Sequence, residues 1–157
     1  MTAQWIIAAG TAIFVALVGF FQWRTAQQKA VLDLFERRHA IYEIVRKAVG
    51  TIASNSTAFD QGREAEFMQA MERAYFFFGD DVDSYVKRLW SDITDVRTAD
   101  MELQGPSDND TRRTILEKRR AAMTRVAQFH SDGMPLFAKY MRFSQTVPLS
   151  MRLFARH

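Results

Sequence analysis

The feature that most constrains the fold is a long uncharged run near the start of the chain. From Trp5 to Trp23 the sequence reads WIIAAGTAIFVALVGFFQW, and no charged side chain precedes Arg24. As a helix that rises 1.5 Å per residue, roughly 19 residues would extend about 28 Å, close to the hydrocarbon thickness of a bilayer. Trp5 and Trp23 would then lie at the two interfaces, where aromatic side chains anchor spanning helices. The run predicts a transmembrane helix, with residues 1–28 as the anchor and its flank.

A cleavable signal peptide and a buried core helix are the alternatives to this anchor. A signal peptide carries basic residues before its apolar run, whereas here the first basic residue follows it. Core helices rarely run this long without a charge. Arg24, Lys29, Arg37 and Arg38 come next, and the positive-inside rule places them in the cytoplasm. We therefore expect an N-terminus outside the membrane and a cytoplasmic C-terminal domain.

Small side chains form one stripe along the predicted anchor. Ala8, Ala12, Ala16 and Gly19 recur at spacings of four, four and three. Such a stripe permits close approach of another transmembrane helix, although small residues are common in any spanning helix. The partners that this segment predicts are membrane lipid and other membrane protein subunits, and a homo-oligomer stays open.

The remainder of the chain predicts an all-α fold. Only three Pro and seven Gly are present, so the turn residues that sheets need are scarce. Apolar residues at spacings of three and four predict helices over about residues 24–48, 63–78, 82–103 and 110–130. A break at Ser131–Gly133 precedes a last short amphipathic segment. Short connections favour an antiparallel bundle of about four helices over residues 29–145, followed by a basic tail over 146–157.

The net charge of +3 conceals a strong asymmetry along the chain. Residues 51–110 carry a balance of −8, and residues 111–157 a balance of +8. These two segments either pair inside the bundle, or the basic one binds anionic lipid or an acidic protein. Nucleic acid is not expected, because the aromatic residues do not interleave with the basic ones. The candidate basic surface comprises Arg112, Arg113, Lys118, Arg119, Arg120, Arg125, Arg152 and Arg156.

No arrangement of residues predicts catalysis, a metal or a cofactor. Cys is absent, which excludes thiolate ligands and cysteine nucleophiles. Glu36 and His39 form a single Glu-x-x-His pair, whereas a di-iron bundle uses two such pairs and two further Glu. The acidic clusters at 80–83 and 108–110 lack the glycine and the distal Glu of a calcium loop, and helix capping explains both. We expect a protein that is not an enzyme.

Three stretches carry a resemblance to other proteins: KAVLDLFERRHAIYEIVRKAV (29–49), AYFFFGDDVDSYVKRLW (74–90) and LFAKYMRFS (136–144). Together they resemble a group of small, functionally uncharacterised bacterial proteins that place one membrane helix before an LFERR-type motif and a helical domain. The resemblance implies a bacterial inner-membrane setting and brings no catalytic residues.

The functional expectation is a membrane-anchored, non-enzymatic accessory or scaffolding subunit of a larger inner-membrane complex. The alternative is a membrane-tethered sensor or effector, in stress or defence, with a basic surface that binds lipid or protein. The aromatic run from Tyr75 to Phe78 would serve either as core or as a contact surface, and the sequence leaves this choice open.

Overall fold

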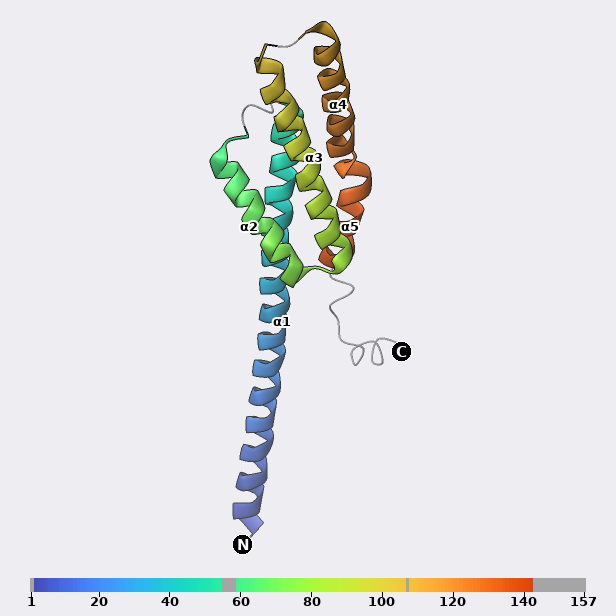
Figure 1. Cartoon of the computed structure of the whole chain (residues 1–157). Helices are drawn as coiled ribbons and strands as arrows, with labels where there is room; N and C mark the ends of the chain where they lie inside the picture. Colours follow the sequence, from blue (N-terminus) through green and yellow to red (C-terminus); the bar gives the residue numbers. More distant parts are fainter. Residues whose placement is uncertain (1, 55–58, 107, 143–157) are drawn as a thin grey trace. The chain divides into compact units, whose positions relative to one another are not determined.

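The computed structural model describes residues 2–54, 59–106 and 108–142, and these contain helices but no strand (Figure 1). The chain divides into two compact units, Met1–Glu36 and Arg37–His157. The predicted all-α bundle of about four helices is confirmed. The elements are α1 (Thr2–Ser54), α2 (Gln61–Phe77), α3 (Asp80–Gln104), α4 (Asn109–Ala127), the π-helical turn η2 (Phe129–Gly133) and α5 (Met134–Met141).

The predicted membrane-spanning helix is not found. Within the described residues, no helix is both long enough and apolar enough to cross a membrane. The predictions of a transmembrane anchor and of an inner-membrane location are therefore wrong.

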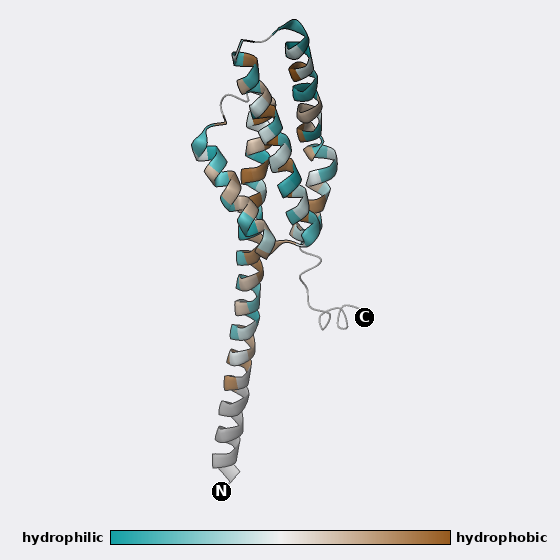
Figure 2. Ribbon diagram, in the orientation of Figure 1, coloured by the Kyte–Doolittle hydropathy of each residue, from teal (hydrophilic) through white to brown (hydrophobic). Residues whose placement is uncertain are grey.

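The second unit packs the end of α1 with α2, α3, α4 and α5 around one core. On α3 the buried side chains Val82, Val86, Leu89, Ile93 and Val96 recur every three or four residues, so they form a single inward face. Figure 1 shows α3 lying between α2 and α4. Figure 2 shows apolar and polar residues interspersed along the helices of this unit, as expected for helices that bury one face.

One end of this core is built from aromatic rings around Phe137, a fully buried residue of α5. The ring of Phe137 lies 5.2 Å from that of Phe78 and 5.5 Å from that of Tyr42, centroid to centroid, with both pairs edge-to-face. Phe129 of η2 packs at 6.3 Å from the same ring. Such pairs add about 0.5–1.5 kcal/mol each beyond the area they bury. The cluster therefore holds α5 firmly against the bundle.

The helix boundaries follow from capping residues. Asp60 begins α2 by accepting a hydrogen bond of 2.9 Å from the Arg63 amide, and Asp108 begins α4 by accepting one from the Thr111 amide at 2.6 Å. The predicted start of α4 was one or two residues late. The predicted break at Ser131–Gly133 is also wrong, because the helical path continues there as the π-turn η2. The first helix, predicted to end at about residue 48, continues to Ser54.

Candidate functional site

The predicted anchor residues that are described, Gly19 and Trp23, lie on an exposed part of α1. The side chains of Trp5, Ala8, Ala12 and Ala16 lie outside the described part of the structure. At Gly19 a Cβ atom would meet nothing within 4 Å, and Trp23 is 52% exposed. The apolar side chains described nearby are also exposed, namely Phe14, Val15, Leu17, Val18, Phe20 and Phe21.

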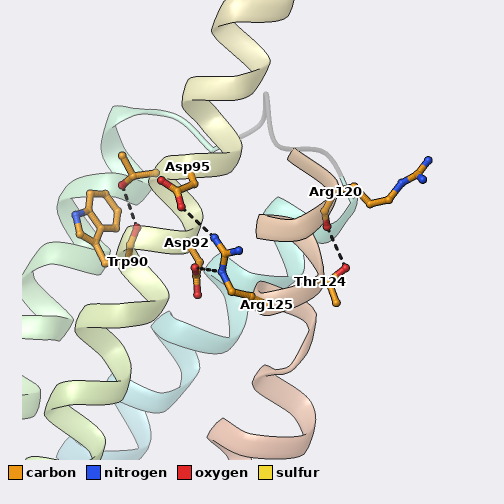
Figure 3. Close-up of polar contacts among 7 residues, drawn as sticks. Trp90, Asp92, Asp95, Arg120, Thr124 and Arg125 are labelled. Carbon is orange, nitrogen blue, oxygen red and sulfur yellow. Dashed lines mark hydrogen bonds and ion pairs between the residues drawn. The ribbon is translucent and has the colours of Figure 1, made fainter. Parts of the chain in front are cut away.

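Two of the predicted basic residues pair with the acidic helix α3. Figure 3 shows Arg125 of α4 reaching Asp92 at 2.5 Å and Asp95 at 3.0 Å. Arg119 of α4 forms a further ion pair of 2.6 Å with Asp100 of α3. We call this row of ion pairs between the two helices the α3–α4 seam. The hydrogen bond with Asp92 raises the pKa of Arg125, so the contact favours the charged form of the guanidinium. Arg119 and Arg125 therefore hold α4 against α3 through ion pairs, and Arg125 stays half-exposed.

The other basic residues of α4 are exposed and form what we call the α4 basic face. Arg113 pairs only with Glu117 of its own helix, at 3.4 Å, and such an exposed pair stabilises little. In Figure 3, Arg120 extends away from the ion pairs of the seam. Leu116 is half-exposed among these side chains. The α4 basic face comprises Arg112, Arg113, Lys118 and Arg120; Arg152 and Arg156 lie outside the described residues.

The aromatic run at the end of α2 divides between core and surface. Phe78 is only 8% exposed, and Phe77 is partly buried against the core. Tyr75 and Phe76, by contrast, are 62% and 78% exposed. Their rings are perpendicular, with centroids 5.2 Å apart. We call this exposed pair of neighbouring aromatic side chains the aromatic edge.

The turn beside the aromatic edge is fixed by Arg38, which the sequence did not single out. Its Nε donates to the Phe77 carbonyl at 2.7 Å, and its Nη1 donates to the Tyr140 carbonyl at 2.8 Å. The guanidinium also lies over the rings of Phe78 and Tyr140 at 5.8 and 5.6 Å. Burial lowers the pKa of Arg38, while Tyr140 opposes this shift. Because both acceptors are backbone carbonyls at helix ends, no side-chain pattern could have marked this residue.

A cleft of about 440 Å³ opens between α3, the end of α4, η2 and α5. Burial is the main cause that raises the pKa of Tyr85 to about 12, and the carboxylates of Asp132 and Asp92 contribute to the shift. The hydroxyl therefore stays protonated at neutral pH and is available as a hydrogen-bond donor. The residues that line the cleft include Tyr85, Arg88, Leu89, Arg125, Asp132 and Leu136.

No group of three or more His, Asp or Glu side chains with the geometry of a metal site occurs within the described residues. Within the described residues of the second unit, the candidate binding surfaces include the α4 basic face, the aromatic edge and the cleft. No protein-family model matches the chain, and no curated protein or solved structure shows significant similarity to it.

Proposed function

We propose that this chain is a non-enzymatic accessory or scaffolding protein that binds a partner protein through the aromatic edge. The observation that carries the proposal is the exposure of Phe76, at 78%, directly beside Tyr75. Clustered aromatic side chains on a protein surface are typical of binding sites, and they contribute much of the energy of protein interfaces. Burying Phe76 in a partner would contribute about 2 kcal/mol before the costs of association.

The aromatic edge is held on a firm base. Phe77 and Phe78 follow it directly, and Arg38 fixes the carbonyl of Phe77 from α1. The ring of Tyr75 lies 5.9 Å from the Lys87 ammonium, which restricts its orientation. A side chain that is already ordered loses less conformational entropy on binding. These contacts favour recognition of a partner by a preformed surface.

Exposed acidic residues adjoin the edge and indicate the chemistry of the partner. Glu72 lies one helical turn before Phe76, and Asp80 follows four residues after it at the start of α3. Charge complementarity steers association and excludes wrong partners more than it adds affinity. Because the Lys87 ammonium also lies over the Tyr75 ring, a partner with an apolar pocket bordered by charges of both signs fits this surface.

Co-purification with matched variants tests the proposal. The full chain, tagged and expressed in the cells that naturally produce it, should retain one stoichiometric protein partner. Phe76→Ser should abolish this retention, whereas Met101→Ser should preserve it, because Met101 is 62% exposed on α3 away from the aromatic edge. Thermal unfolding of both variants checks that each is folded. A partner that stays bound to Phe76→Ser, or the absence of any stoichiometric partner, would refute the proposal.

A second candidate function rests on the α4 basic face. There the chain would be a sensor or effector that binds an acidic protein through Arg112, Arg113, Lys118 and Arg120, with Leu116 as an apolar contact. Binding of this kind weakens steeply with salt. For this candidate, the partner protein should be lost at high salt and in the double variant Arg112→Glu, Arg120→Glu. The partner should still be retained by Phe76→Ser, which separates this candidate from the first.

A further inference from the structure

The cleft between α3, α4, η2 and α5 has an apolar floor and polar walls. Leu89 of α3 is almost fully buried at the base, and Leu136 of α5 is partly buried beside it. Arg88 and Tyr85 line the α3 side, and Asp132 lines the side formed by η2. A volume of about 440 Å³ falls within the range of small-molecule pockets.

The charges that line the cleft are not all neutralised by one another. Asp92 and Arg125 form an ion pair of 2.5 Å, and Arg125 also binds Asp95, so both are already paired. Arg88 and Asp132, in contrast, form no ion pair within 4 Å with any residue that the structure describes. Arg88 lies over the ring of Tyr85 at 6.0 Å, which orients the guanidinium. The cleft thus presents one cation and one anion to a ligand.

Tyr85 fixes the geometry between these two charges. A Cβ atom on Gly133 would lie 2.7 Å from Tyr85 Cε1 and 2.6 Å from Phe129 Cδ2, so the Tyr85 ring packs tightly against the backbone of η2. Asp132 is the residue directly before Gly133, and the guanidinium of Arg88 lies over the same Tyr85 ring. π-Helical turns occur frequently at functional sites. The site is therefore preformed, which lowers the entropic cost of binding.

We propose that this cleft binds a small zwitterion, with the ligand carboxylate on Arg88, its ammonium on Asp132 and an aliphatic body over Leu89 and Leu136. A simple carboxylate would face Asp132, and a simple amine would face Arg88, so each would meet a like charge. A zwitterion satisfies both charges at once. An aliphatic α-amino acid has this chemistry and a suitable size, and the site is independent of the partner-binding aromatic edge.

Calorimetry and ligand-observed NMR on the full chain test this assignment with L-leucine as the probe. Two matched compounds each lack one charge: 4-methylpentanoate lacks the ammonium, and 3-methylbutylamine lacks the carboxylate. We expect leucine to bind at least about tenfold more tightly than either, which corresponds to about 1.4 kcal/mol. Equal binding of leucine and one of these compounds would overturn the proposal, as would a lack of leucine binding at millimolar concentration.

Variants locate the site. Arg88→Gln should weaken leucine binding about tenfold and remove the preference over 3-methylbutylamine, and Asp132→Asn should remove the preference over 4-methylpentanoate. Arg46→Gln and Asp110→Asn remove equivalent charges on exposed helical surfaces outside the cleft and should leave binding unchanged. Because all four positions are exposed, the variants should fold, and unfolding curves verify this. Leucine binding that survives Arg88→Gln and Asp132→Asn with its preferences intact would place the ligand elsewhere and refute the proposal.

Discussion

The guanidinium of Arg38 donates a hydrogen bond of 2.8 Å to the main-chain carbonyl of Tyr140, although 102 residues separate them in the chain. The same side chain donates to the carbonyl of Phe77. Both acceptors lie in the last turn of a helix, where carbonyls lack partners within the helix and where a positive charge is favourable. One residue of α1 thus ties together the ends of α2 and α5, beside the aromatic edge.

Replacing Arg38 should therefore destabilise the bundle. Arg38→Met removes two charge-assisted hydrogen bonds, and we expect the free energy of unfolding to fall by about 2–3 kcal/mol. Arg38→Lys should recover less than half of this loss, because an ammonium lacks the fork of donors that reaches two carbonyls. Urea unfolding measures both. The control Arg46→Met breaks an exposed pair with Glu43 and should cost much less than Arg38→Met. An equal cost would contradict the role of Arg38.

Gly79 should tolerate no larger residue. A Cβ atom there would collide with the Tyr140 hydroxyl and come within 3.1 Å of Asp81 Oδ1. Gly79→Ala should therefore lower the free energy of unfolding by about 1–3 kcal/mol. Gly50→Ala is the matched control, because a Cβ atom in that helical position meets nothing within 4 Å and should stabilise the chain by about 0.5–1 kcal/mol. Part of the Gly79→Ala loss should vanish in a Tyr140→Phe background, which lacks the colliding oxygen.

Asp81 should make stability depend on acid pH. Its hydrogen bonds with the Tyr140 hydroxyl, at 2.7 Å, and with Lys139 lower its pKa. A carboxyl whose pKa is lower in the folded state stabilises that state above its unfolded pKa of about 3.9, and this contribution disappears as the pH falls through the folded pKa. Asp81→Asn should thus reduce the difference in unfolding free energy between neutral pH and the pH range below about 3.9. An unchanged difference in Asp81→Asn would exclude the mechanism.

How far the sequence predicts the fold is clear from α3. Val82, Val86, Leu89, Ile93 and Val96 repeat with the period of a helix, so their common buried face could be predicted directly. For the aromatic run at the end of α2, the same reasoning could not predict which residues are buried and which are exposed. Successive residues of a helix point about 100° apart, so four adjacent aromatic residues carry no periodic information about which of them face inward.

The candidate sites depend on contacts between elements that are distant in sequence. The opposite charges of the two segments predicted that α3 and α4 could pair. Which residues pair depends on the antiparallel register of the two helices: Arg125 reaches Asp92, whereas Arg112 does not face a carboxylate within the described part of the chain. The cleft needs side chains of α3, η2 and α5 together. The triplet Ser131, Asp132 and Gly133 reads locally as a helix break, whereas packing of Tyr85 against Gly133 lets the helical path continue as a π-turn.

The ion pair of Arg125 with Asp92 between α3 and α4 should contribute to the stability of the bundle. Arg125→Gln should lower the free energy of unfolding by about 1–2 kcal/mol, because it leaves the partly buried carboxylate of Asp92 without its cation. A double-mutant cycle with Asp92→Asn should return a coupling energy of about 0.5–1 kcal/mol. That coupling should shrink in about 1 M salt, where the Debye length is only about 3 Å. Arg112→Gln on the α4 basic face should change stability by less than about 0.5 kcal/mol. A coupling energy near zero in the cycle would mean that apolar packing, and not the ion pairs, aligns the two helices.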